Sequence, residues 1–274
     1  MSTLQGVYLK VERARKHADQ LCAEMSKLDE NDPDVAGRIV VEKDTKAQEY
    51  VPRWVGKRHC PARWSLMLGE IFYNMRSALD HFAWQLTLRS EAKVTKTTQL
   101  PICISEHDFK RVAGRALKGV HLNYVTLIEG IQPYRAAPND PCSSVLWLIG
   151  RLNNIDKHRL LHVVEHQVSD ARLLLSVDGQ MLGPPPITKI VAAGTRLDPQ
   201  TELARIPWRA FDRLVKRKVY VHSNLGTYIA FGKGQPVEDG DESIESMPVV
   251  ATLRLCVEYM EEEFLPFINR LWRL

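Results

Sequence analysis

The sequence lacks the motifs that mark several large protein classes. Its five cysteines are scattered without a CxxC pair, which argues against a zinc knuckle and against a disulfide framework. No P-loop, no GxGxxG after a strand and no GxSxG is present, so nucleotide-dependent catalysis and nucleophile-elbow chemistry are not expected. No uncharged run approaches bilayer length, and the N-terminus lacks the apolar stretch of a signal peptide. We therefore expect a cytoplasmic protein with no membrane partner and no cofactor.

The net charge and the composition exclude few classes of protein. The 274 residues carry 37 basic and 33 acidic side chains, a formal charge of +4, and 45% of the residues are hydrophobic. This composition is ordinary for a globular chain that buries a core. A weakly basic balance permits an RNA partner but does not indicate one.

The order of hydrophobic patterns predicts an α+β fold. Residues 1–160 are expected to form a helical bundle with a short hairpin at 38–56, followed by an antiparallel β segment at 161–245. A C-terminal helix within 246–274 is expected to close on the bundle. The helices of the bundle are expected at 2–28, 62–89, 105–117, 122–131 and 141–160.

The helix at 62–89 carries two contrasting faces. One is an apolar stripe formed by Leu68, Phe72, Met75, Leu79, Phe82 and Leu86. The other is polar and aromatic together and contains Glu70, Tyr73, Asn74, Ser77, His81 and Trp84. Arg76 and Asp80, four residues apart, can form an intrahelical ion pair of about 0.2–0.5 kcal/mol. The polar face is therefore either solvated or part of a hydrogen-bond network.

The stretch NMRSALDHFAWQL in this helix resembles the Arg-x(4–6)-His signature of the HEPN superfamily of endoribonucleases. The resemblance implies a helical bundle, RNA as a partner, a homodimer, and metal-independent RNA cleavage in stress or phage response. Arg76 and His81 would be catalytic: a neutral imidazole takes the 2′-hydroxyl proton, and a guanidinium stabilises the phosphorane. Asn74 and Asp80 would support them. In an ideal helix Arg76 and His81 point about 140° apart, so dimer pairing or a distortion would have to bring them together.

A second polar segment, NNIDKHR, ends the helix expected at 141–160. One interpretation is an ordinary helix C-terminus, where basic residues and Asn are favourable. The other is that Asn154, Asp156 and His158 face the first motif across a packed helix pair and belong to the same site. The chain also resembles a broad group of bacterial proteins that combine such a helix with an NNIDKHR-like segment.

A metal site is the next candidate. HRLLHVVEH places His158, His162 and His166 four residues apart if the helix persists, which is a possible ligand spacing. The β-branched run HVVEHQV instead favours a strand, and no HExxH is present. No bound metal is expected, although Asp80, His81, Asp156 and His158 would form a carboxylate-imidazole cluster if the two helices meet. Such a cluster would suit a metal-dependent hydrolase.

Two classes of function remain open besides that hydrolase. The chain is expected to be either a HEPN-like endoribonuclease or a non-catalytic helical binding or assembly protein. The distinguishing observation is whether Arg76 and His81 line an exposed cleft or are paired inside the bundle.

Overall fold

The structure, a computed structural model, consists of two compact units. The helical unit comprises Met1–Cys22, Ala62–His162 and Val250–Leu274, and the β unit comprises Ala23–Pro61 and Val163–Val249. The residues that the structure describes are 3–31, 38–55, 61–158, 163–177, 180–184, 187–198, 200–209, 219–231, 244 and 247–273. The expected α+β fold class is confirmed.

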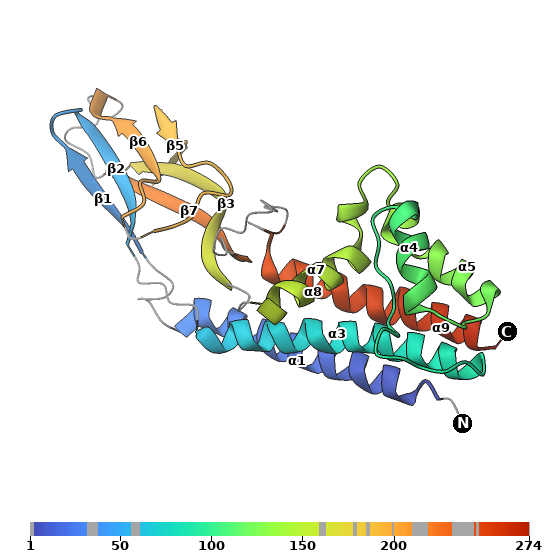
Figure 1. The fold of residues 1–274 in the computed structure, drawn as a ribbon. Helices are drawn as coiled ribbons and strands as arrows, with labels where there is room; N and C mark the ends of the chain where they lie inside the picture. The colour runs from blue at the N-terminus through green and yellow to red at the C-terminus, as the bar shows by residue number, and fades with distance from the viewer. Residues whose placement is uncertain are drawn as a thin grey trace. The chain divides into compact units, whose positions relative to one another are not determined.

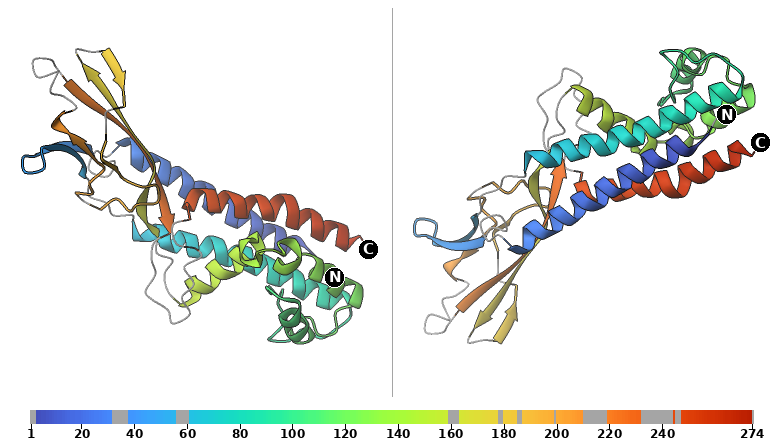
Figure 2. Two further views of the ribbon diagram at one scale, coloured as in Figure 1. Left: turned by 90° about the horizontal axis from the view of Figure 1, so that it is seen from above. Right: turned by 90° about the horizontal axis from the view of Figure 1, so that it is seen from below.

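Long helices that run side by side build the helical unit (Figures 1 and 2). Its elements are α1 (Gln5–Asn31, shared with the β unit from Ala23), α3 (Ala62–Arg89), α4 (Glu106–Ala116), α5 (Leu122–Gly130), α6 (Pro133–Ala136), η1 (Pro141–Ser143), α7 (Val145–His158), α8 (Val249–Glu258), η3 (Tyr259–Phe264) and α9 (Leu265–Trp272). Among the residues that the structure describes, no helix is both long and apolar enough to cross a membrane.

The apolar stripe of α3 is the centre of this unit. All six of its expected members are buried, and Phe82 packs edge-on against Phe264 with ring centroids 5.7 Å apart. Because Phe264 lies in the C-terminal helical segment, that segment closes on the bundle. Burial of such side chains is the main source of stability for the unit.

The C-terminal segment differs from the single regular helix that its periodicity predicts. A π-helical turn, η3, joins α8 to α9, and the amide of Leu265 donates to the carbonyl of Met260 five residues earlier. Pro266 follows directly and has no amide hydrogen to donate. A π turn is a usual way for a helix to absorb such an interruption.

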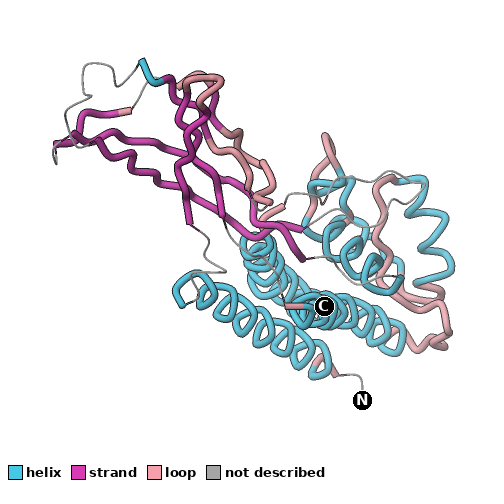
Figure 3. Tube along the Cα trace, turned by 90° about the vertical axis from the view of Figure 1, so that its left-hand side faces the viewer, coloured by secondary structure: helices cyan, strands magenta, loops and turns pink. Residues whose placement is uncertain are grey.

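The β unit holds the strands (Figure 3). They are β1 (Arg38–Asp44), β2 (Glu49–Val55), β3 (Val163–Val177), β4 (Gln180–Gly183), β5 (Lys189–Ile190), β6 (Ala204–Pro207) and β7 (Val219–Phe231). One sheet has the strand order β1-β2-β6-β5 and the other β4-β3-β7. Trp54, Val168 and Leu203 belong to one buried cluster, so the two sheets share a core.

The hairpin formed by β1 and β2 lies in a different unit from the one expected. The sequence pattern grouped residues 38–56 with the helical bundle, but β2 pairs antiparallel with β6 through Glu49 and Tyr50. The hairpin is therefore a part of the β unit. Its pairing partner lies about 157 residues further along the chain, where local periodicity gives no sign of it.

Candidate functional site

Helix α3 presents four sides, three of which are covered by the helical unit. Its apolar stripe faces the core, while Gly69 faces Asp156 of α7. On the other flank, His81 and Gln85 face the first turn of α1. The fourth side lies between the two flanks. Each candidate residue of α3 belongs to one of these sides.

Arg76 lies on the α7 side of α3 and forms a closed set of hydrogen bonds. Its guanidinium donates to both Asp80 carboxylate oxygens, at 3.2 and 2.7 Å, and to the carbonyl oxygen of Leu100 at 2.7 Å. The amide of Leu100 in turn donates to Asp80 at 3.0 Å. The Arg76 side chain is only 12% exposed. The pair therefore fastens the segment around Leu100 to α3, which is more than a solvated intrahelical ion pair does.

Asp80 is the titratable member of this set. Burial raises the pKa of its carboxyl above the ordinary value, and the nearby charge of Arg76 and the Leu100 amide offset only part of that increase. The proton on Asp80 is therefore lost at a higher pH in the folded protein than in the unfolded chain. Deprotonation of Asp80 accordingly lowers stability as the pH rises through this interval.

His81 lies on the opposite flank and packs under the start of α1. A Cβ added to Gly6 would overlap its imidazole ring, so the ring contacts the α1 backbone directly. Nε2 of His81 is 3.3 Å from Nε2 of Gln85, whose Oε1 accepts a hydrogen bond from the amide of Thr3 at 3.0 Å. These contacts give His81 a packing environment between two helices.

Within one chain, the fold does not bring Arg76 and His81 together. One contacts the Leu100 segment and the other contacts α1, on opposite flanks of a helix that runs unbroken through 28 residues. This agrees with the angle of about 140° for an ideal helix, and no distortion reduces it. Their catalytic roles remain a prediction.

The side chain of Asn74 forms a hydrogen bond within α3. Its side-chain amide donates to the carbonyl oxygen of Glu70 at 2.8 Å, one turn earlier. Glu70 also lies 3.3 Å from Nδ1 of His17 on α1. Asn74 is thus engaged on the α1 flank and does not contact Arg76 or Asp80 through any hydrogen bond described for it.

Helices α3 and α7 are neighbours, as the sequence predicts. The contact lies closer to the N-terminus of α3 than expected, because the Asp156 carboxylate lies against Gly69. Gly69 and Asp80 are eleven residues apart, about 16 Å along the helix axis. Asp156 therefore does not join the Arg76–Asp80 set. Burial raises the pKa of its carboxyl above the ordinary value.

The two asparagines of NNIDKHR have different environments. Asn154, the predicted site member, is exposed, while Asn153 is almost fully buried. Asn154 lies about 200° around α7 from the buried Leu152, which explains its outward direction. Asn154 therefore points to a different side of α7 from Asp156, and its role in a composite site remains a prediction. His158 is the last residue of α7, and its side chain lies outside the described part of the structure.

The histidine spacing does not form a helical metal site. Helix α7 ends at His158, and His166 lies in β3 opposite Ile229, while His162 falls outside the described residues. Across the described ranges, no group of three or more His, Cys, Asp or Glu side chains could hold a metal ion. The expected alternative is a strand over HVVEHQV, and its described part, Val163 onward, lies in β3.

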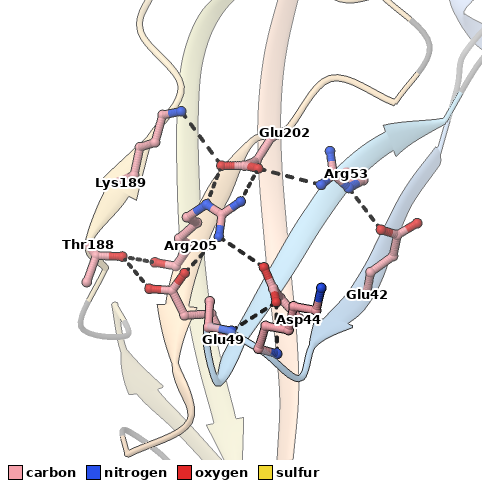
Figure 4. Close-up of polar contacts among 10 residues, drawn as sticks. Glu42, Asp44, Glu49, Arg53, Thr188, Lys189, Glu202 and Arg205 are labelled. Carbon is pink, nitrogen blue, oxygen red and sulfur yellow. Dashed lines mark hydrogen bonds and ion pairs between the residues drawn. The ribbon is translucent and has the colours of Figure 1, made fainter.

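The β unit contains the second polar constellation, centred on Arg205 (Figure 4). Its guanidinium donates to Glu202 at 2.7 and 2.8 Å, to Glu49 at 3.0 Å and to Asp44 at 3.3 Å. Arg53 bridges Glu42 and Glu202 beside it. The hydrogen bond from Arg205 lowers the pKa of Glu202, and these contacts raise that of Arg205. Because the charges satisfy one another across β1, β2 and β6, this network joins strands.

Sequence patterns missed the partners that decide these roles. Leu100 contributes only backbone atoms, which carry no sequence signal. Gly6 and Gly69 did carry a sequence signal, because glycine inside a helix costs up to about 1 kcal/mol relative to alanine and often marks a place where another part of the chain packs closely against the helix. At both positions a side chain from the neighbouring helix fills the space.

Comparison with known proteins gave no match: no family model, no curated protein and no solved structure is significantly similar to this chain.

Proposed function

We propose that the protein is a non-catalytic assembly protein whose helical unit binds a second copy of itself through α3. The observation that carries the proposal is an exposed stripe on the fourth side of α3. Leu66, Tyr73, Trp84 and Leu88 are 56%, 55%, 41% and 43% exposed. On a helical wheel they fall within about 60° of one another, with Ser77 among them. We call these five residues the α3 stripe.

The surroundings of Arg76 and His81 support a structural role for both. To reach an RNA phosphate, Arg76 would have to release Asp80 and the Leu100 carbonyl oxygen. His81 would have to leave its contact with Gly6. Groups held in this way contribute to the packing of the bundle, which is the behaviour expected of a non-catalytic helical protein.

The order of residues along the stripe favours a second copy as the occupant. Counted outward from Ser77, Leu66 and Leu88 lie eleven residues away on either side. A two-fold axis through Ser77 would therefore place Leu66 of one copy against Leu88 of the other in an antiparallel helix pair. The same operation places the Trp84 indole N–H near the Glu70 carboxylate, a donor against an acceptor. Self-complementarity of this kind is what an interface between identical subunits requires.

The size of the stripe sets the strength of the association. Leu66 and Leu88 are separated by about 33 Å of helix, so a strip roughly 10 Å wide covers on the order of 330 Å². A standard interface buries about 800 Å² on each partner. We therefore expect a monomer-dimer equilibrium that depends on concentration. Leu9, 57% exposed on the adjoining α1, can extend the contact.

Sedimentation velocity over a concentration series tests this proposal. Wild-type protein is expected to shift from monomer to dimer as concentration rises, and Trp84→Glu is expected to stay monomeric, because it places a carboxylate in the apolar contact. Leu255→Glu is the matched control: Leu255 is 45% exposed but lies on α8, away from the stripe. Equal behaviour of the two variants, or a wild type that is monomeric throughout, would contradict the proposal.

A HEPN-like endoribonuclease is the second candidate, and the Arg-x4-His spacing of Arg76 and His81 favours it. In this proposal RNA is the partner, and the two subunits of the dimer supply the catalytic pair. Purified protein should then cleave RNA in EDTA, and His81→Ala should lower the rate by roughly 10²–10⁴-fold. No cleavage by wild type at concentrations where it is dimeric would remove this candidate and leave the assembly function intact.

A further inference from the structure

We propose that a pocket at one end of the helical unit binds a small phosphate monoester of about mononucleotide size. The pocket is open to solvent on one side and has a volume of about 540 Å³, within the usual range for small-molecule sites. It lies where the end of α3 meets the start of α5. The residues that line it are Arg89, Ser90, Glu91, His121, Asn123, Tyr124 and Leu127. This inference does not depend on the assembly function.

Arg89 is the residue that points to an anion. Its guanidinium carbon lies 4.9 Å from the centroid of the Trp272 ring and 5.9 Å from that of Tyr124. Nη1 donates to the carbonyl oxygen of Trp272 at 2.5 Å. The cation is thus held in one orientation by two aromatic rings and one carbonyl group.

Among the described residues, the contacts of Arg89 are with the two aromatic rings and the Trp272 carbonyl oxygen, and none is an ion pair with a carboxylate. The Trp272 carbonyl occupies one of its five N–H donors, and the side chain is partly buried. A partly buried charge is normally paired, because withdrawal from water is costly. A phosphate in the pocket would supply the missing negative charge, and a guanidinium suits its geometry through two parallel hydrogen bonds.

Other donors line the same pocket. Nδ1 of His121 accepts a hydrogen bond from the amide of Asn123 at 3.3 Å, so the neutral ring carries its proton on Nε2. The Ser90 hydroxyl oxygen accepts from the amide of His121 at 3.1 Å, which leaves the hydroxyl hydrogen to donate elsewhere. His121, Ser90 and Arg89 together can therefore donate to the oxygens of one phosphate.

The charge and the walls of the pocket restrict the ligand. Arg89 is the single Lys or Arg among the residues that line it, and Glu91 adds a carboxylate. A single phosphate is therefore favoured over a polyphosphate or a nucleic-acid strand, which require several cations. Tyr124 and Leu127 offer an aromatic ring and an apolar chain, which suit a flat, largely apolar body attached to the phosphate.

Isothermal titration calorimetry with adenosine monophosphate, inorganic phosphate and adenosine tests the proposal. Adenosine monophosphate is expected to bind saturably and most tightly, followed by phosphate, because the oxyanion supplies the main contact and the base adds to it. Adenosine is expected to bind most weakly. Adenosine binding as tightly as its monophosphate, or no saturation by either phosphate compound up to about 5 mM, would overturn the proposal.

Matched variants locate the site. Arg89→Lys keeps the charge but loses the fork and the stacking, and is expected to weaken binding of adenosine monophosphate by about tenfold or more. His121→Ala leaves the Trp272 contact intact and is expected to weaken binding several-fold, so it covers the case in which the Arg89 variant misfolds. Arg111→Ala, on the exposed face of α4, is the control and should bind as wild type does. An equal loss in the Arg111 variant would show nonspecific attraction and contradict the site.

Discussion

Replacing Arg76 by alanine tests the structural role assigned to this side chain. The substitution removes three hydrogen bonds and leaves the Asp80 carboxylate and the Leu100 carbonyl oxygen without their cation. Hydrogen bonds to charged groups contribute about 1.5–3 kcal/mol, and an acceptor left without a partner costs about 1–3 kcal/mol. Asp80 is 33% exposed, so water replaces part of the loss. We expect the free energy of unfolding of the helical unit to fall by about 2–3 kcal/mol.

The assay combines urea denaturation with hydrogen exchange. Exchange reports on the Leu100 amide itself, which donates to Asp80 and should become less protected in Arg76→Ala. Asp80→Asn is the companion variant, since its amide oxygen can still accept from Leu100. In a double-mutant cycle the two positions should couple by about 1 kcal/mol or more. A loss below about 0.5 kcal/mol with unchanged protection at Leu100 would refute the reasoning and return the pair to an ordinary surface contact.

Three further outcomes follow from the contacts of individual residues. Asp156→Asn should stabilise the protein near neutral pH, because burial raises the pKa of Asp156 and its ionisation is costly there; melts should show the gain disappearing below the ordinary pKa, where the carboxyl is protonated in both states. Arg205→Met should lower the stability of the β unit at neutral pH and make that stability depend less on pH in the acid range. The reason is that the lowered pKa of Glu202 contributes stability above its ordinary pKa, and this contribution is lost as the pH falls through the folded value. A pH series of hydrogen exchange at β6 that matches wild type would contradict this. Gly6→Ala should destabilise the packing of α1 on α3 by about 1–3 kcal/mol, and His81→Ala should relieve that loss in the double variant, which calorimetry can check; simple additivity would mean that the ring does not contact Gly6.

Local sequence patterns predicted the elements well and their partners poorly. The bounds of α3 follow from Pro61 before it and an unbroken helical period within it, so they could be predicted to the residue. The hydrogen bonds of Arg76 could not, because they end on backbone atoms of Leu100, 24 residues further along the chain. For the same reason, local patterns could not show that the β1–β2 hairpin belongs to the β unit, because this depends on pairing with the distant strand β6. The different burial of Asn153 and Asn154 could have been predicted from the sequence. The buried residues Ile149 and Leu152 define the inner face of α7, and helical spacing places Asn153 near that face and Asn154 opposite it.

The most direct test of the assembly proposal is disulfide cross-linking at Ser77. A residue on a two-fold axis meets its own copy, so Ser77→Cys, with Cys60 and Cys142 replaced by serine, should form a covalent dimer on mild oxidation. Thr126→Cys on α5, in the same background, is the control and should form no covalent dimer. Rapid cross-linking through position 77 alone is the predicted result. Equal cross-linking at both positions, or none at position 77 under conditions where sedimentation shows a dimer, would contradict an interface centred on the α3 stripe.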